Sequence, residues 1–430
     1  MKHYCRLVAY LLSSVLPLVA PVVAHGQTDP PTQADLTAKV EELQRELEDV
    51  RLQLAALKKD APAQAAAVTS SAPAAPIAST SGAPTLAGLL GPTSLSGFVD
   101  MYYGYNANQP ANRTSSFRSF DAFTNQFALN LVELVVDKQP VATNSRTGYH
   151  IALGFGQAIN AVNGTEFGGL GFDQYLKEAY FSYLAPAGKG LQVDFGKFVT
   201  PAGAEVIETK DNWNYSRGIL FSYAIPYYHF GMRAKYTFND KYSLTGYVVN
   251  GWNNVVDNNT GKTYGMSFGW NPTKKVSITE NYLAGPEQAV NSNWRQLWDT
   301  VVTYSPTSKL SFTLNPDYGR GDRVTGIAHP VYWAGVAGYV KYALNPAYAL
   351  ATRYEYYNDH DGFTTGTAQH FNGITGTFEH TIASHILTRL EFRRDMSNQP
   401  TFVKGNNIPV VAQNTAAAGL VFMFDSREAK

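Results

Sequence analysis

From about residue 93 to the end of the chain, apolar and polar side chains alternate along many short segments. In YHIALGF, one face consists of Tyr149, Ile151, Leu153 and Phe155, with small or polar residues between them. The same period recurs in HFGMRAKYTF, KTYGMSFGW, KLSFTLN and near the C-terminus. Successive side chains of a β-strand point to opposite faces, so this pattern predicts strands that bury one face.

Tight turns and long polar loops separate these segments in strict alternation. Short connections contain Pro, Gly, Asn or Asp, as at 239–241, whereas the loops at 200–228 and 251–262 are long and polar. This arrangement is typical of an up-and-down antiparallel β-barrel, with short periplasmic turns and long outside loops. We predict an all-β transmembrane barrel of about 16 strands, with 14–18 allowed because two segments, 127–137 and 295–304, break the alternation.

A different period marks residues 33–59. Their apolar positions lie alternately 4 and 3 residues apart, which is the heptad pattern of a coiled coil. The pattern predicts self-association of parallel helices, with one amphipathic helix packed on its own barrel as the alternative. Three heptads do not distinguish a dimer from a trimer. The predicted seam consists of Leu36, Val40, Leu43, Leu47, Val50, Leu54 and Leu57.

The chain begins with a predicted secretory signal peptide. Lys2 and Arg6 precede a short apolar stretch and the small-residue cleavage site Val22-Val23-Ala24. Residues between the heptads and the barrel are rich in Ala, Pro, Ser and Thr and predict a linker. The predicted order is a signal peptide at 1–24, a periplasmic coiled-coil helix at 33–59, a linker at 60–92 and an outer-membrane β-barrel at 93–430.

Composition narrows the class of protein. The chain has 34 basic and 34 acidic residues and a formal net charge of zero, which argues against a nucleic-acid partner. Its many Tyr and Trp side chains at strand ends predict aromatic girdles in contact with outer-membrane lipid. The single cysteine, Cys5, lies in the predicted signal peptide, so the mature chain has no thiol for metal binding or catalysis.

Several barrel motifs resemble a known family. GKFVTPAGAEVIE, NYSRG, IPYYHFGMR and VVNGWNNVVDNNTGKTYG follow in this order after the opening strand GFVDMYYGYNANQP. Together they resemble the OmpL-like group of outer-membrane β-barrel porins, from about residue 95 to the C-terminus. The resemblance implies an outer-membrane pore and leaves its transported substrate undefined.

Charged side chains fall on the polar side of several predicted strands. A charge on the lipid face costs roughly 2–4 kcal/mol near the bilayer midplane, so these side chains are expected in the lumen. There they either set ion and solute selectivity or brace the wall. The predicted pore wall consists of Arg233, Lys235, Arg353, Glu355, Arg389, Glu391 and Arg393.

The longest predicted loop, 200–228, is the third on the outside and carries Glu205, Glu208 and Asp211. In trimeric general porins the third loop folds into the barrel and places acidic residues opposite a basic wall. By analogy of architecture, we expect these three carboxylates to form the loop side of a pore constriction.

Other candidate chemistry is weaker. NTGKT at 259–263 lacks the first Gly and the strand-to-helix context of a phosphate loop. DNNTG at 257–261 lacks the Glu of a calcium loop. The histidines form no catalytic set by spacing. We predict no metal ligand, no cofactor and no enzymatic activity.

These observations predict a passive diffusion channel for small hydrophilic solutes or ions in a Gram-negative outer membrane, assembled as a homotrimer. One alternative is a plugged structural barrel that tethers the envelope to the cell wall through its periplasmic coiled coil. A second alternative is an outer-membrane barrel enzyme. Conductance in planar bilayers separates the channel from both.

Overall fold

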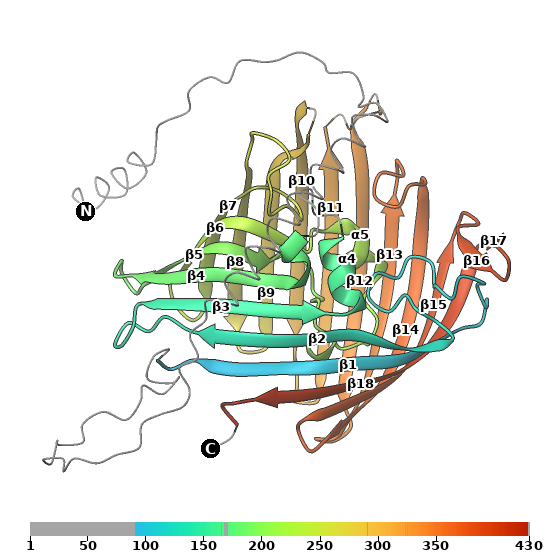
Figure 1. Cartoon of the computed structure of the whole chain (residues 1–430), viewed down its shortest axis with the longest axis horizontal. Helices are drawn as coiled ribbons and strands as arrows, with labels where there is room; N and C mark the ends of the chain where they lie inside the picture. The colour runs from blue at the N-terminus through green and yellow to red at the C-terminus, as the bar shows by residue number, and fades with distance from the viewer. Residues whose placement is uncertain are drawn as a thin grey trace, which may run out of the picture. The chain divides into compact units, whose positions relative to one another are not determined.

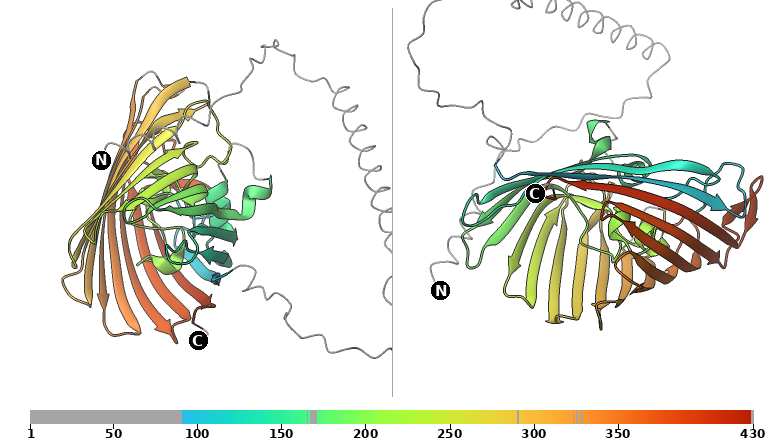
Figure 2. Two further views of the ribbon diagram at one scale, coloured as in Figure 1. Left: turned by 90° about the vertical axis from the view of Figure 1, so that its left-hand side faces the viewer. Right: turned by 90° about the horizontal axis from the view of Figure 1, so that it is seen from below.

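The structure is a computed structural model that describes residues 91–428, except 165, 167–170, 290, 323, 325 and 328. The predicted signal peptide, the coiled-coil helix and nearly all of the predicted linker lie outside the described residues. Within them, sixteen antiparallel strands close into a barrel, and the last strand, β18, pairs with the first, β1 (Figures 1 and 2). The predicted barrel and its strand count are confirmed.

Each strand pairs with its neighbours in chain order around the wall. The first eight are β1 (Ser94–Asn106), β2 (Gln126–Lys138), β3 (Thr147–Phe155), β4 (Leu176–Ala185), β5 (Leu191–Val199), β6 (Tyr228–Thr237), β7 (Tyr242–Val249) and β8 (Thr263–Thr273). The other eight are β9 (Val276–Gln288), β10 (Asn291–Tyr304), β11 (Leu310–Gly321), β12 (Val331–Ala343), β13 (Tyr348–Asp359), β14 (Gln369–Ile382), β15 (Ile386–Ser397) and β18 (Ala412–Asp425). A separate hairpin, β16 (Phe402–Lys404) and β17 (Ile408–Val410), lies between β15 and β18.

The alternation of the sequence becomes an alternation between the outer surface and the lumen. In β13, Tyr354 and Tyr356 are exposed on the outside, while Arg353 and Glu355, which alternate with them, are fully buried on the inside. The outward row is apolar and aromatic, as a lipid-facing surface requires, and charged side chains collect inside the barrel.

The two segments with broken alternation have different causes. In β2, the register with β1 shifts between Asp100 and Met101, so Asn130 and Leu131 are both buried. Such a β-bulge inserts one extra residue and shifts the period of two. In β10, the pairing with β9 is regular from Trp294 onward, but the inward-facing Leu297 is apolar because it packs in a hydrophobic cluster inside the barrel.

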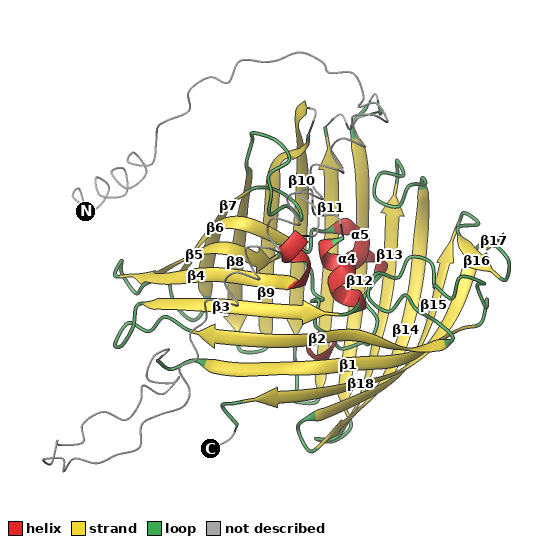
Figure 3. Cartoon of the chain, in the orientation of Figure 1, coloured by secondary structure: helices red, strands yellow, loops and turns green. Residues whose placement is uncertain are grey.

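That cluster is built by segments that enter the lumen between strands. They are the first loop (L1, residues 107–125), helix α4 (Gln157–Asn163) and the third loop (L3, residues 200–227). The short helix η1 (Gly171–Tyr175) follows α4 and contributes no residue to the cluster. L3 contains the short helices η2 (Thr209–Asp211) and α5 (Ile219–Ala224) (Figure 3). No helix among the described residues is long and apolar enough to cross a membrane.

Residues from α4, α5 and the wall meet in this cluster. Ile159 of α4, Leu220 of α5 and Trp333 of β12 are all fully or almost fully buried in it. Gly319 of β11 lies directly opposite Trp333, and a Cβ atom at Gly319 would be 1.9 Å from Trp333 Cε2. The absence of a side chain at Gly319 therefore lets the indole lie against the wall, where its Nε1 donates to Ala224 O of α5 at 3.0 Å.

Gly319→Ala should destabilise the barrel, because the new methyl group must push the Trp333 ring off the wall and away from α5. Overpacking of this kind costs about 1–3 kcal/mol, measurable as a lower free energy of unfolding in urea. Gly338→Ala is the matched control, since no atom lies within 4 Å of a Cβ at Gly338. Equal losses in the two variants would contradict the proposed close approach.

Candidate functional site

L3 contacts strands from widely separated parts of the wall. Near its start, Ala204 N donates to Asn315 Oδ1 of β11 at 2.8 Å. Farther along, Tyr215 Oη donates to Asp100 Oδ1 of β1 at 2.8 Å. β11 and β1 are far apart in the strand order, so the loop crosses the lumen.

The predicted contact between an acidic loop and a basic wall exists at Glu205. Its Oε1 accepts from Arg353 Nη1 of β13 at 2.6 Å, and its Oε2 accepts from Gly218 N at 2.6 Å. Arg353 Nη1 also donates to Ser216 O at 2.6 Å. Both side chains are buried, at 4% and 0% exposure. Burial raises the pKa of the Glu205 carboxyl, whereas the Arg353 guanidinium favours its ionised form.

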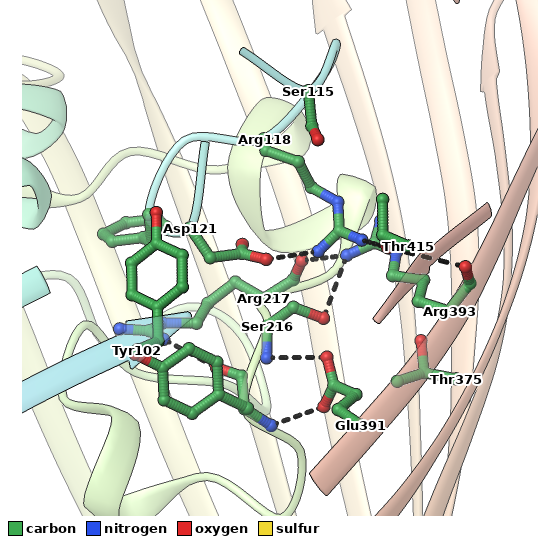
Figure 4. Close-up of polar contacts among 12 residues, drawn as sticks. Tyr102, Ser115, Arg118, Asp121, Ser216, Arg217, Thr375, Glu391, Arg393 and Thr415 are labelled. Atoms are coloured by element: carbon green, nitrogen blue, oxygen red, sulfur yellow. Dashed lines mark hydrogen bonds and ion pairs between the residues drawn. The ribbon is translucent and has the colours of Figure 1, made fainter. Parts of the chain in front are cut away.

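Wall carboxylates also hold the loop. Glu391 of β15 accepts from Tyr215 N at 2.6 Å and from Ser216 N at 3.0 Å (Figure 4). Glu355 of β13 accepts from Leu220 N at 3.1 Å, at the start of α5. Glu355 and Glu391 therefore provide acceptors for backbone groups that are buried away from water.

Wall arginines complement the loop carbonyls in the same way. Arg389 Nη1 donates to Thr209 O at 2.6 Å. Arg393 Nη1 donates to Arg217 O at 2.6 Å (Figure 4). Arg393 Nη2 also lies 3.3 Å from Glu355 Oε1. This ion pair connects the charged residues of β15 with those of β13, so the wall charges form one network. Five predicted wall residues thus contact L3 or each other: Arg353, Glu355, Arg389, Glu391 and Arg393.

Glu208 finds a basic partner that the sequence analysis does not identify. Its carboxylate accepts a hydrogen bond from the ammonium group of Lys177 in β4. The same Lys177 Nζ donates to Glu133 Oε2 of β2 at 2.7 Å. The register of β3 with β4 shifts between Ala152 and Leu153, which places Lys177 at an irregular position of its strand. A period of two therefore gives no signal for where the Lys177 side chain points.

The remaining predicted residues do not meet in this network. Asp211 pairs with its neighbour Lys210 at 2.6 Å and its side chain is 53% exposed. Arg233 of β6 pairs with Asp194 of β5 at 2.8 Å, and Lys235 is exposed. Asp211 therefore pairs within the loop and not with the wall. Its side chain lies at the exposed tip of L3, whereas Glu205 lies in the buried part of the loop.

L3 also contains a cation to which the sequence analysis gives no role. Arg217 Nη1 donates to Thr209 Oγ1 and to Tyr215 O, both at 2.8 Å, and its guanidinium lies 4.7 Å from the Phe120 ring of L1. Burial lowers the pKa of Arg217, and the nearby Asp100 acts in the opposite direction. The loop is thus folded around its own arginine as well as against the wall.

Two cavities lie beside the tip of L3. One, of about 170 Å³, lies against the inner faces of β10, β11 and β12 and is lined by Asp211, Thr303 and Thr313. The other, of about 270 Å³, lies near the ends of β1 and β18 and is lined by Lys210. Neighbouring residues of opposite charge therefore face different water-accessible spaces. The described residues hold no group of three or more His, Cys, Asp or Glu placed to bind a metal ion.

Arg353→Gln should destabilise the barrel strongly, because it leaves Glu205 buried without its charge partner. Removing one member of a buried pair costs about 3–5 kcal/mol, which urea unfolding followed by tryptophan fluorescence can measure. Arg233→Gln serves as control, since this side chain is 22% exposed and its loss should cost less. A loss for Arg353→Gln no greater than for the control would show that the pair does not hold L3.

Comparison with known proteins places this geometry in context. The anion-selective porin from Comamonas acidovorans has 10% sequence identity and a TM-score of 0.53, covering 77% of this chain and 99% of that chain. OmpT, an outer membrane protein of Vibrio cholerae, has 11% identity and a TM-score of 0.51, with 77% and 97% covered. The outer membrane channel DcaP of Acinetobacter baumannii has 11% identity and a TM-score of 0.50, with the same coverage. At these identities the likeness shows the fold alone.

A search of curated protein sequences finds no match. The family model described as "Putative beta-barrel porin-2, OmpL-like" matches residues 92–424, which is all of the barrel but the last residue of β18. This agrees with the resemblance carried by the motifs around L3. The chain belongs to this OmpL-like porin family.

Proposed function

We propose that the protein is a passive diffusion channel for small hydrophilic solutes or ions, narrowed by L3. The observation that supports this most directly is the course of L3 across the lumen, with Lys210 and Asp211 at its tip facing separate cavities. A solute that crosses the barrel through these cavities would meet the tip, because the rest of the loop is packed against the wall. No energy source is needed for such passage.

The charges of the site divide into two groups by exposure. Glu205 and Arg353 are buried and paired, so their fields largely cancel and their role is to hold the loop. Glu208, whose side chain is 15% exposed, is held by Lys177 in a similar way. Lys210 and Asp211 also pair with each other, at 2.6 Å, but their side chains are 30% and 53% exposed, so both can meet a passing solute. The proposed filter is therefore the loop tip, supported by the buried network.

A closed structural barrel is the second candidate. It is favoured by the apolar cluster in which Ile159, Leu220 and Trp333 pack inside the lumen, since such a cluster excludes water. The two candidates differ in a single observable, the ionic current through the purified barrel.

Planar-bilayer recordings test the channel and its filter. The native protein should give stepwise conductance. Asp211→Asn should lower the cation-to-anion permeability ratio by roughly twofold, because one exposed negative charge is removed beside the path. Lys210→Gln should raise the ratio.

Asp240→Asn, in the exposed turn between β6 and β7, is the matched control and should leave the ratio unchanged. A purified barrel that never conducts would rule out the channel and favour the closed structure. Conduction with the same permeability ratio in Asp211→Asn would instead remove L3 from the filter.

A further inference from the structure

A row of hydroxyl groups crosses four neighbouring strands on the lumen side of the wall. Ser277 of β9 lies opposite Thr303 of β10, and Thr303 lies opposite Thr313 of β11. Thr313 in turn lies opposite Tyr339 of β12. Phe312, next to Thr313, is exposed on the outer surface. Since successive side chains of a strand point to opposite faces, the hydroxyl row faces the lumen.

Three members of this row, on β10, β11 and β12, line the cavity of about 170 Å³ beside the tip of L3. L3 contributes Trp213, Asp211 and Glu205 to the same lining. The rings of Trp213 and Tyr339 meet nearly at a right angle, with their centroids 6.5 Å apart. The cavity therefore combines two aromatic rings, hydroxyl groups and two carboxylates.

Some polar groups of the lining have unused hydrogen-bonding capacity. Tyr339 is only 6% exposed, yet none of the described residues forms a hydrogen bond with its Oη. A buried polar group without a partner is uncommon. The hydroxyls of Thr303 and Thr313 lie 3.1 Å apart, so one donates to the other and the second keeps its proton for another acceptor. Asp211 Oδ2 pairs with Lys210, which leaves its Oδ1 as an acceptor.

The charges of the lining are already paired. Glu205 pairs with Arg353, and Asp211 pairs with Lys210. An anion would meet two carboxylates here, and an ammonium group offers no acceptor for the Tyr339 hydroxyl. A neutral solute with several hydroxyl groups both donates and accepts hydrogen bonds, and its C–H face can pack on an aromatic ring. The lining therefore matches the chemistry of a polyol or a sugar.

We propose that this cavity binds a neutral polyhydroxylated solute, such as a monosaccharide. Its binding groups are the side chains of Trp213, Tyr339, Thr303, Thr313 and Asp211. The proposal names the class of solute for the proposed channel, and its role in transport rests on that function. Binding itself does not require that the barrel conducts.

Tryptophan fluorescence of the folded barrel in detergent, titrated with glucose, tests the site. Trp213 lines the cavity, so glucose should change the emission in a saturable way, and Trp213→Phe should lose this change. Tyr339→Phe removes one hydroxyl and should weaken binding roughly two- to tenfold. Tyr247→Phe is the matched control, since this wall tyrosine is similarly buried, at 8% exposure, but does not line the cavity and should keep native affinity.

Three outcomes would overturn the proposal. One is the absence of a saturable response to glucose at about 100 mM. Another is a response to ethylammonium chloride without one to glucose, because aromatic rings and carboxylates would then be binding a cation. The third is equal affinity for glucose in the native protein and Tyr339→Phe.

A second variant tests the site if Tyr339→Phe does not fold. Thr313→Val keeps the shape of the side chain and removes its hydroxyl, so glucose should again bind roughly two- to tenfold more weakly. Native affinity in this variant would contradict the assignment of the hydroxyl row to the site.

Planar-bilayer recordings separate this inference from the channel itself. Glucose should reduce the KCl current through the native barrel, and a higher concentration should be needed in Tyr339→Phe. A barrel that conducts KCl but neither binds glucose nor is blocked by it would overturn the site and keep the channel. A barrel that binds glucose without conducting would keep the site and overturn the channel.

Discussion

A loop buried inside a barrel must find a hydrogen-bond partner for each of its backbone groups, and the rest of this structure follows from that requirement. L3 has little regular secondary structure, so it cannot satisfy these groups by itself. The wall provides the partners: Glu355 and Glu391 accept from loop N–H groups, while Arg353 and Arg389 donate to loop carbonyls. The mixed signs of the wall charges match the two kinds of backbone group.

Apolar packing is the second interaction that holds L3 inside the barrel. Trp333 and Leu297 face inward from strands whose neighbours carry polar lumen residues, and both are buried in the apolar cluster, where α5 covers Trp333. Glycines allow this close fit, as at Gly419, where a Cβ atom would be 2.3 Å from the Tyr215 ring. The lumen therefore combines a folded core toward the loop side with polar cavities beside the tip of L3.

The sequence alone predicts the barrel and the contact at Glu205 but not the full site. A period of two places Arg353 and Glu391 in the lumen, since each lies between two outward-facing residues, Thr352 and Tyr354 for the first and Leu390 and Phe392 for the second. The same reasoning fails at Lys177 and Asn130, because a register shift moves the period locally. It also fails at Leu297, an apolar side chain that faces inward because it packs in the apolar cluster inside the barrel. Which inward residues meet across strands depends on register, so the pairing of Asp299 with Asp317 becomes visible only in the folded barrel.

The central claim is that L3 stays folded inside the lumen, with its backbone around Ser216 buried and its tip exposed. Thiol reactivity measures this directly, because the only natural cysteine, Cys5, lies in the predicted signal peptide and leaves the barrel without a thiol. Cysteine is introduced singly at Ser216, which is 0% exposed, or at Asp211, and the folded barrel is treated with a charged thiol reagent. The account predicts that the thiol at 216 reacts at least about tenfold more slowly than the thiol at 211, as expected for a group that opens to water only by local unfolding. Equal rates at the two positions would show that L3 does not remain seated.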